Sequence, residues 1–472
     1  MKHIAILGAG PGGYVAAIRA AQLGARVTVV ENQALGGVCL NWGCIPSKAL
    51  LSVVDLGDKI KKAADLGIDL PAGLTYNAAS MVARKNKVVS GLVKGIATLF
   101  ATWGIEHIEG TGELVDARTL RVSKTDGSEA RLSADAIIVA TGSSWPDLPK
   151  FPIDGRRIIT SKQALDLERV PSRLLIIGGG VEGCEFASLY SGLGTNVTIV
   201  EMLPRLLPLE DEEIGQFMER ELKKRGVEIR TGTTVDKLEQ SQESLNTVFK
   251  DGSRSSVDQV LVSVGRGFNS RGIGLEKASV QVGSRGEILV NDRMETNVAG
   301  IYAIGDVVGK AMLAHVASAQ GKVAVENILS GPRTMNYDVI PAGIFTLPEI
   351  GRVGLTEQEA RERAQSQGLN PQQAIRIGRF RYAALGKAQG TGETVGLFKV
   401  IAEAETGRLL GVHIVGAHAA DLIHEAALAM QVGATVHQVA EMIHAHPTLA
   451  EGMLEAMEDV AGRAIHMARK RG

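Results

Sequence analysis

Two cysteines with four residues between them, Cys39 and Cys44, are the residues whose type and spacing point most directly to chemistry. Because the loop is so short, a disulfide between them would stabilise the fold little through chain entropy. A thiol pair beside a cofactor can instead open and close as a disulfide during turnover. Two other interpretations stay open, a chance pair of buried free thiols and half of a zinc site. Zinc needs about four ligands, and the third cysteine, Cys184, has no such partner.

A glycine-rich turn precedes the cysteines and joins a predicted strand, residues 4–7, to an alanine-rich predicted helix. Its glycines, Gly8, Gly10 and Gly13, have the G-x-G-x-x-G spacing that lets a backbone approach a pyrophosphate at a helix N-terminus. The next predicted strand ends at Glu31, where a carboxylate can accept hydrogen bonds from ribose hydroxyls. The turn therefore predicts a dinucleotide site.

The same unit occurs a second time. A predicted strand, residues 174–177, leads into a turn and a helix, and the strand that follows ends at Glu201. The glycines of this second turn are Gly178, Gly179, Gly180 and Gly183. Glu31 follows Gly8 by 23 residues, and Glu201 follows Gly178 by the same 23. One copy could be an ordinary tight turn, but two copies with the same offset predict two dinucleotide sites.

Two further segments belong with the first unit. Residues 136–142 are predicted to form a buried strand that ends in a small-residue turn, and residues 296–306 a strand that delivers Asp306 at its tip. The stretch between them would hold the second unit as an insertion. From about Ile340 the chain has no nucleotide turn. Strand-like segments are found at residues 398–402 and 409–415, and an amphipathic segment with helical spacing at residues 420–431. These patterns predict an α/β chain with two Rossmann-like dinucleotide-binding domains, one inserted in the other, and a C-terminal α+β domain for packing or oligomerisation.

A histidine near the C-terminus is the second chemical signal. Pro447 restricts His446 to extended geometry, and Thr448 is expected to start a helix. Glu451 could complete a Thr-x-x-Glu capping box, or it could orient the imidazole as a base. A dithiol enzyme needs a base near neutral pH, which favours the second interpretation. We expect His444 to be a supporting or packing residue.

The composition is that of a globular chain, with 45% hydrophobic and 22% charged residues. A net charge of −1 and an aromatic content of 4% argue against binding to nucleic acid or to an anionic membrane. We find no apolar run of about 20 residues, so no membrane span is expected. The chain opens in a predicted strand, with no room for a signal peptide, and has 3 cysteines, so a cytoplasmic location is expected.

The segment from Gly36 to Lys48, GGVCLNWGCIPSK, resembles the redox motif of the flavin disulfide reductases. With both glycine turns, the Asp306 segment, residues 312–315 and the His446 segment, the resemblance covers essentially the whole chain. Within that family the chain most resembles the enzymes that oxidise protein-bound dihydrolipoyl groups with FAD and pass the electrons to NAD. The implied domains are an FAD domain (1–150 and 273–340), an NAD domain (151–272) and an interface domain (341–472).

The resemblance also implies roles for the candidate catalytic residues. Cys44 would be the thiol next to the flavin, in a charge-transfer complex with oxidised FAD, and Cys39 would exchange with the substrate. His446 would take the proton of the substrate thiol, supported by Glu451. The domain that carries His446 would form a homodimer and present this histidine to the dithiol of the partner.

A set of cofactor contacts follows from the same resemblance. Lys48 and Glu185 would form an ion pair beside the flavin, and Glu201 would disfavour the 2′-phosphate of NADP. The residues expected at the FAD site are Gly8, Gly10, Gly13, Glu31, Lys48, Gly112, Thr141, Gly142, Asp306 and Ala314. Those expected at the NAD site are Gly178, Gly179, Gly180, Gly183, Glu185, Glu201, Val235 and Gly265. No metal is expected.

The expected partners are lipoyl domains of acyltransferase subunits or the lipoyl protein of glycine cleavage. A glutathione reductase-like enzyme is the main alternative, but it would need basic residues near the second ribose, where Arg205 is the only candidate. A mercuric reductase would carry a C-terminal cysteine pair, and the segment Ala468–Gly472 has none. Soluble transhydrogenases lack the first cysteine. A non-catalytic flavoprotein subunit is the alternative from another functional class.

Overall fold

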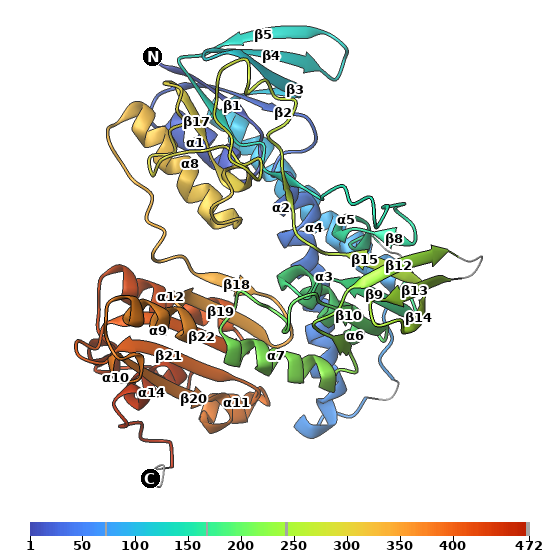
Figure 1. Ribbon diagram of the computed structural model, residues 1–472, viewed down its shortest axis with the longest axis vertical. Coiled ribbons are helices and arrows are strands. Elements are labelled where there is room, and N and C mark those ends of the chain that lie inside the picture. Colours follow the sequence, from blue (N-terminus) through green and yellow to red (C-terminus); the bar gives the residue numbers. More distant parts are fainter. Residues whose placement is uncertain (71–72, 167–168, 241–243, 469–472) are drawn as a thin grey trace.

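The computed structural model describes residues 1–70, 73–166, 169–240 and 244–468, which Figure 1 shows as three lobes. The upper lobe holds the N-terminal unit, the lower right lobe the second unit, and the lower left lobe the C-terminal part of the chain. Of the closing segment Ala468–Gly472, residues 469–472 lie outside the described residues.

The upper lobe is built on a seven-stranded sheet with the order β17-β6-β1-β2-β3-β4-β5. The strands are β1 (His3–Leu7), β2 (Arg26–Glu31), β3 (Glu106–Asp116), β4 (Thr119–Lys124), β5 (Glu129–Ser133), β6 (Ala136–Val139) and β17 (Ile301–Ala303). Strand β1 pairs in parallel with β2 on one side and with β6 on the other, and β6 pairs in parallel with β17. Their runs of Ile, Val and Ala are almost wholly buried, as in a parallel sheet covered on both faces. Because β17 follows the second unit in sequence, that unit is inserted in the first domain, as predicted.

Two helices, α1 (Pro11–Gln22) and α8 (Ala314–Leu329), pack closely against each other in this lobe. A Cβ on Gly321 would lie 2.7 Å from the carbonyl oxygen of Gly12, so a small residue is needed there. The predicted strand 296–306 is shorter than expected, because only β17 is a strand. Asp306 lies in the short helix η2 (Gly305–Val308) that follows it.

The second unit forms a five-stranded parallel sheet with the order β11-β10-β9-β15-β8. Its strands are β8 (Ile158–Ile159), β9 (Arg173–Ile177), β10 (Asn196–Val200), β11 (Glu228–Arg230) and β15 (Gln259–Val262). Helix α5 (Ser161–Ala164) follows β8, α6 (Val181–Gly192) follows β9, and α7 (Glu212–Lys224) follows β10. An antiparallel sheet of β12 (Val235–Gln240), β13 (Leu245–Phe249) and β14 (Arg254–Val257) precedes β15. The pair β7 (Ser143–Ser144) and β16 (Gly267–Phe268) lies where the chain enters and leaves this unit.

The cysteines lie on two consecutive helices, α2 (Gly37–Trp42) and α3 (Cys44–Lys61), which are followed by η1 (Ala63–Leu66) and the long α4 (Ala78–Thr102). Contrary to our expectation, one stretch, Gly37–Lys61, is long and apolar enough to span a membrane by length and composition alone. In this fold its apolar side chains Leu50, Leu51 and Val54 are buried in a cluster that also contains residues of α6.

The C-terminal lobe has an antiparallel sheet with the order β18-β19-β22-β21-β20. Its strands are β18 (Ala342–Ile344), β19 (Glu349–Gly354), β20 (Ile375–Arg381), β21 (Leu397–Glu403) and β22 (Leu409–Gly416). The helices are α9 (Glu357–Ser366), α10 (Pro371–Ala374), η3 (Tyr382–Ala384), α11 (Gly386–Thr391), α12 (Ala419–Gln431), α13 (Val436–Ala440) and α14 (Glu451–Val460). The predicted strands at 398–402 and 409–415 and the amphipathic helix at 420–431 are therefore present.

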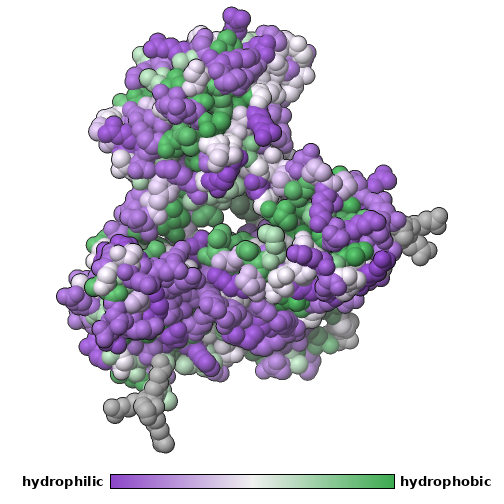
Figure 2. Space-filling model, in the orientation of Figure 1, coloured by the Kyte–Doolittle hydropathy of each residue, from purple (hydrophilic) through white to green (hydrophobic). Residues whose placement is uncertain are grey.

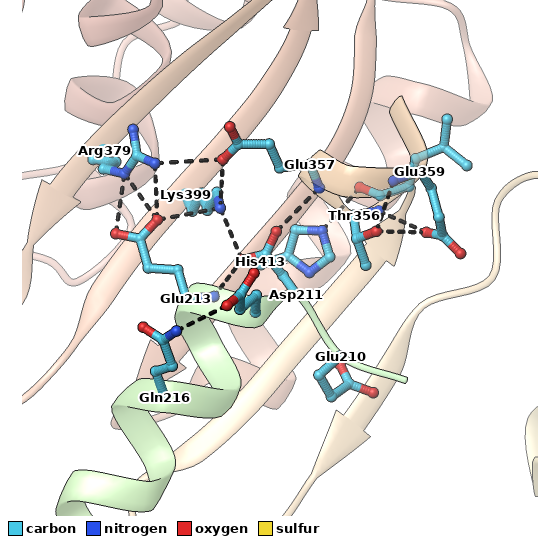
Figure 3. A network of polar contacts seen from close by, with 12 residues as sticks. Glu210, Asp211, Glu213, Gln216, Thr356, Glu357, Glu359, Arg379, Lys399 and His413 are labelled. Carbon is cyan, nitrogen blue, oxygen red and sulfur yellow. Dashed lines mark hydrogen bonds and ion pairs between the residues drawn. The ribbon is translucent and has the colours of Figure 1, made fainter. Parts of the chain in front are cut away.

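Figure 3 shows a buried network of charges that joins the second unit to this C-terminal sheet. Lys399, whose side chain is 3% exposed, lies 2.8 Å from Asp211, 3.2 Å from Glu213 and 2.9 Å from Glu357. Arg379 pairs with Glu213 at 2.9 Å. Two of these carboxylates lie at the start of α7 and one at the start of α9. Because a buried charge is tolerated only when it is paired, the network fixes how the two lobes sit on each other.

Candidate active site

One continuous cavity of about 1400 Å³ is lined by residues of all three lobes. Figure 2 shows hydrophobic side chains gathered around the hollow between the lobes. The predicted residues that line the cavity are Gly8, Gly10, Glu31, Cys39, Cys44, Lys48, Gly112, Thr141, Gly142, Gly180, Glu185, Gly265, Asp306 and Ala314. Both predicted nucleotide turns and both thiols therefore open onto the same space.

The first glycine turn shows why each glycine is needed. Gly8 has a φ of +106°, and a Cβ there would lie 2.3 Å from the carbonyl oxygen of Ala140. A Cβ on Gly13 would lie 1.9 Å from the carbonyl oxygen of Gly8, so this position brings the helix close to the strand. Gly10 differs, because its nearest neighbour would be the Cα of Gly37 at 4.0 Å. No described residue requires a glycine at position 10, but a phosphate bound at the uncapped N-terminus of α1 would.

The second turn repeats this pattern residue by residue. Gly178 has a φ of +112°, and a Cβ there would lie 1.9 Å from the carbonyl oxygen of Ser263. A Cβ on Gly183 would lie 2.0 Å from the carbonyl oxygen of Gly178. Gly180, at the uncapped N-terminus of α6, has nothing within 4 Å of its Cβ position. The chain therefore offers two cradles that fit the pyrophosphates of FAD and NAD.

Each predicted ribose acid is anchored to its own turn. Glu201 accepts hydrogen bonds from the backbone N–H groups of Gly179 at 2.6 Å and Leu203 at 2.8 Å. Glu31 accepts the equivalent two bonds in the first turn, at 2.7 and 2.8 Å. A carboxylate has about four lone-pair positions, so each acid keeps the capacity to accept a ribose hydroxyl.

A basic residue near the second ribose would be needed to hold a 2′-phosphate, and Arg205 is already occupied. Its guanidinium donates to the carbonyl oxygens of Leu207, Pro208 and Glu210 at 3.2, 2.7 and 3.0 Å. These bonds hold the loop before α7. Arg205 is therefore not available to pair with NADP.

The two cysteines have different acidities. Both are free thiols, and they are hydrogen-bonded to each other. The hydrogen bond from Cys39 lowers the pKa of Cys44 to about 7 against the opposing effect of burial, and the charge of Lys48 lowers it further. The same hydrogen bond, together with burial, raises the pKa of Cys39. Cys44 is thus the more acidic thiol of the pair. Among the described residues no cluster of three or more His, Cys, Asp or Glu could hold a metal, which leaves the zinc interpretation without further ligands.

The predicted ion pair beside the thiols is present. Nζ of Lys48, one turn after Cys44 on α3, lies 2.9 and 2.7 Å from the two carboxylate oxygens of Glu185 on α6. Lys48 also lies 4.6 Å from the ring centroid of Phe345, whose backbone N–H donates to Glu185 at 2.9 Å. This pair connects the cysteine helix to the second unit and to the C-terminal lobe.

The predicted Asp306 is held by two polar residues that were not predicted, Ser143 and Arg266. The hydroxyl of Ser143 donates to Asp306, and Arg266 donates to the hydroxyl and the carbonyl oxygen of Ser143, both at 2.7 Å. The guanidinium of Arg266 lies 4.8 Å from the ring centroid of Trp145. Burial lowers the pKa of Arg266, while the negative charges of Glu182, Asp306 and Cys44 oppose that shift. The signal was available, since Arg266 follows the predicted Gly265 at the end of a buried strand.

The turn after β6 is held by another unpredicted residue, Asn269. The hydroxyl of Thr141 donates to the carbonyl oxygen of Asn269 at 2.7 Å, and the Asn269 amide donates back to the carbonyl oxygen of Thr141 at 2.9 Å. The backbone N–H of Asn269 also donates to Gly142 at 3.1 Å. These bonds fix the predicted Thr141 and Gly142 in the cavity wall.

The remaining predicted cofactor residues differ in placement. Gly112 lies in β3, where a Cβ would meet Leu7 at 2.6 Å, and Ala314 begins α8. Gly265, with a φ of +102°, borders the cavity. Val235, the first residue of β12, is fully buried in the core and lies outside the cavity lining, so the structure does not bring it to the other predicted cofactor residues.

His446 is paired as the functional interpretation required. Its Nδ1 lies 2.8 Å from one oxygen of Glu451, and the other oxygen accepts the backbone N–H of Thr448 at 2.8 Å. Burial raises the pKa of Glu451, but the Thr448 N–H and His446 outweigh it and the net shift is downward. Our prediction that Thr448 starts the helix is wrong, because α14 begins at Glu451. The Thr448 hydroxyl donates to the carbonyl oxygen of Ala445 instead of capping the helix.

The thiols and the histidine do not meet within one chain. His446, whose side chain is 75% exposed, is absent from the lining of the cavity that Cys39 and Cys44 share. In Figure 1, α14 lies low in the left lobe and α2 near the upper centre. The side chain of His444 is 3% exposed, and its Nε2 lies 3.0 Å from Glu425, which fits the supporting role expected of it.

Comparisons with known proteins cover nearly all of the chain. Residues 2–321 match the family model described as pyridine nucleotide-disulphide oxidoreductase, and residues 340–457 match the dimerisation domain of that family. A dihydrolipoyl dehydrogenase of Bacillus subtilis is 39% identical, with 98% of this chain and 99% of the relative covered. One of Thermus scotoductus is 41% identical, with 98% of each covered. The crystal structure of LpdA from Mycobacterium tuberculosis is similar with a TM-score of 0.90 at 29% identity, covering 98% of this chain and 100% of that one.

Proposed function

Since this chain belongs to the pyridine nucleotide-disulphide oxidoreductase family, we propose that the cavity is the active site of a dihydrolipoamide dehydrogenase that uses FAD and NAD. The reaction oxidises a dihydrolipoyl group to a lipoyl group and transfers its two electrons to NAD. The observation that carries the proposal is that both nucleotide cradles and both thiols border one cavity. Electrons can then pass between the thiols and the two nucleotide sites inside this cavity.

The thiol steps follow from the different acidities of the two cysteines. With Cys39 and Cys44 joined as a disulfide, a deprotonated substrate thiol attacks Sγ of Cys39, and Cys44 leaves as a thiolate. A leaving thiol of pKa about 7 departs faster than an ordinary one. The second substrate thiol then displaces Cys39 from the mixed disulfide, which closes the lipoyl ring and leaves the enzyme with two additional electrons.

The protons move through a histidine. His446 of the partner subunit accepts the proton of the first substrate thiol and passes it to Cys39 when that sulfur is released. The proton of the second substrate thiol then stays on His446 and balances the charge of the Cys44 thiolate. Glu451 supports this role because it binds Nδ1 and so orients Nε2 as the acceptor. Among the described residues Nε2 has no hydrogen-bond partner, which leaves it free for the substrate.

When bound, FAD supplies two-electron transfer between the dithiol and NAD. The first cradle, Glu31 and Asp306 would hold FAD, and Lys48 would lie beside its ring. The second cradle and Glu201 would hold NAD. The chain's own residues position the two reactants. Lys48, held in place by Glu185, lowers the pKa of Cys44, and the charge of Glu185 opposes this effect in part.

The match to the family's dimerisation domain indicates a homodimer. We infer that the substrate is the lipoyl arm of an acyltransferase subunit of a 2-oxo acid dehydrogenase complex, or of the lipoyl protein of glycine cleavage. All of these present the same dithiol. We also infer a cytoplasmic location, in keeping with a dithiol that must stay reducible.

Steady-state assays with free dihydrolipoamide, using NAD and NADP in parallel, test this function. The kcat/KM should favour NAD by about 100-fold or more, because Glu201 repels a 2′-phosphate and like charges cost several kcal/mol. Equal use of the two cofactors would show that the Glu201 assignment is wrong. Turnover of glutathione disulfide with NADPH would support the glutathione reductase alternative. A yellow protein without dihydrolipoamide turnover would support the non-catalytic one.

A further inference from the structure

An acidic side chain that this mechanism does not use lines the cavity beside the second glycine turn. Glu182 is the second residue of α6, and its side chain is half-buried. One of its oxygens accepts a hydrogen bond from the hydroxyl of Ser263 at 3.0 Å. Among the described residues the other oxygen, Oε1, has no hydrogen-bond partner. The N-terminus of α6 is expected to bind a phosphate, and the carboxylate of Glu182 repels that phosphate. We expect a favourable contact between Glu182 and another part of the ligand to offset this repulsion.

The position of Glu182 on α6 places it along the path of a bound dinucleotide. Gly180, at the start of the helix, marks the pyrophosphate cradle, and Glu185 marks the Lys48 pair beside the thiols. Residues three apart share one helix face, so Glu182 and Glu185 both face the cavity. If a dinucleotide extends from this cradle towards the thiols, its nicotinamide end lies beside Glu182.

The cavity lining also contains Arg266, Asp306 and Cys44. The charge of Arg266 interacts with those of Glu182, Asp306 and Cys44. Arg266 itself is engaged by Ser143 and by the ring of Trp145. Among the described residues no ion pair within 4.0 Å joins Arg266 to Glu182. The negative charge of Glu182 is therefore available to a ligand.

Building on the proposed function, we propose that Glu182 recognises the nicotinamide end of NAD. Its free Oε1 accepts a hydrogen bond from the carboxamide NH₂, and Ser263 orients the carboxylate for it. The nicotinamide ring of NAD carries a positive charge, so a carboxylate complements both the charge and the donor. Glu182 is thus a specificity-determining residue for NAD, separate from Glu201 at the adenosine ribose.

The test compares ligands that differ only at the nicotinamide end. Calorimetric titration of the FAD-loaded enzyme would use NAD, ADP-ribose, which lacks the nicotinamide, and 3-acetylpyridine adenine dinucleotide, which lacks the NH₂. Glu182→Met should weaken NAD binding about 10-fold or more, as for loss of a hydrogen bond to a charged group. The affinities for ADP-ribose and for the acetylpyridine analogue should change much less. The affinity of Glu182→Gln for NAD should lie between those of the wild type and Glu182→Met, because the amide oxygen can still accept a hydrogen bond.

Two matched variants complete the design. Glu212→Gln removes an acid from the first turn of α7, outside the cavity lining, and should leave all three affinities unchanged. Ser263→Ala should weaken the binding of NAD more than that of the other two ligands, but by a smaller factor than Glu182→Met does. The proposal is overturned if Glu182→Met changes NAD and ADP-ribose by the same factor, or if it weakens the acetylpyridine analogue as much as NAD. These affinity ratios are independent of dihydrolipoamide turnover, so a failure here is distinct from a failure of the proposed function.

Discussion

At the scale of single residues, Glu451 shows how one carboxylate can serve two neighbours. One oxygen holds Nδ1 of His446 and the other the backbone N–H of Thr448, which lies before the helix. The sequence left open whether this acid caps a helix or orients an imidazole. The geometry combines part of both, because the bond to Thr448 fixes the carboxylate that in turn orients the ring. We therefore assign the basic lone pair of His446 to Nε2.

His446→Gln is expected to retain FAD and to be reduced by NADH, yet to lose most dihydrolipoamide turnover. The reason is that hydride transfer to the flavin needs no thiol base, whereas general acid–base groups contribute about 10²–10⁴-fold. Rapid-mixing absorbance of the flavin with NADH gives the control measurement, and steady-state turnover gives the effect. A loss of turnover well under tenfold would count against the role.

The acidity of Cys44 gives a prediction for pH. In the reduced protein without flavin, the ultraviolet thiolate absorbance that disappears in Cys44→Ser should titrate with a midpoint near pH 7. It should be lost as the pH falls below that value, because the thiolate becomes protonated. Lys48→Met should move the midpoint upward, since a nearby positive charge favours the thiolate. An unchanged midpoint in Lys48→Met would show that Lys48 does not stabilise this thiolate.

The sequence predicted the chemistry of the site better than its supporting contacts. The spacing of glycines and cysteines is local, so Gly10, Gly180 and the thiols could be placed from the sequence. Arg266 and Ser143 were missed, although they bind each other at 2.7 Å, because 123 residues separate them in the chain. A contact of that kind forms where the chain enters and leaves the second unit, and no local pattern encodes it.

At the scale of secondary-structure elements, the start of α7 is tied to the C-terminal sheet by Lys399. Lys399→Met should destabilise the protein by about 3–5 kcal/mol, because it leaves the buried Asp211 without its counter-charge. Glu213 and Glu357 keep Arg379 as a partner. Lys223→Met, which removes an exposed pair with Glu219 on α7, is the matched control and should cost under about 1 kcal/mol. Equilibrium urea unfolding of both variants measures the difference. Equal midpoints for the two variants would contradict the proposed importance of the network.

The same network has a defined dependence on pH. Burial opposes ionisation of Asp211 and Glu357, but Lys399 outweighs it and lowers the pKa of both. Their folded-state pKa values lie below the unfolded ones, so this stabilisation is present above the ordinary carboxyl range and is lost as the pH falls through the lowered values. The stability difference between the wild type and Lys399→Met should therefore shrink at acid pH.

Element boundaries were predicted least well, for physical reasons that differ between sites. The strand at 296–306 shortens to β17 because Gly300, with a φ of +88°, turns the chain before it. The helix predicted to start at Thr448 starts three residues later, at Glu451, because the Thr448 hydroxyl binds the preceding carbonyl oxygen of Ala445 and does not cap the helix. By contrast β1, β6 and β9 follow their buried apolar runs closely, since a central parallel strand needs little beyond such a run.

At the scale of the whole molecule, one chain does not bring the proposed base to the proposed thiols. The cavity holds the thiols but not His446, and Ile443, three residues before that histidine, is 96% exposed. Leu428 and Val432 on α12 and the loop after it are 66% and 71% exposed. Apolar side chains gathered near a proposed catalytic base suit an interface between two copies. A two-fold axis would then bring the His446 of each chain to the thiols of the other.

Mixing two inactive chains tests this shared site. Cys44→Ser lacks the thiolate and His446→Gln lacks the base, so each homodimer should have little activity. If the chains are denatured and refolded together in equal amounts with FAD, random pairing makes about half of the dimers mixed. Each mixed dimer then has one site with the thiols of one chain and the histidine of the other, so roughly a quarter of wild-type activity should return. If both groups came from one chain, a mixed dimer would hold no intact site. Differently tagged chains verify that mixed dimers form, and no recovery in their presence would rule out the shared site.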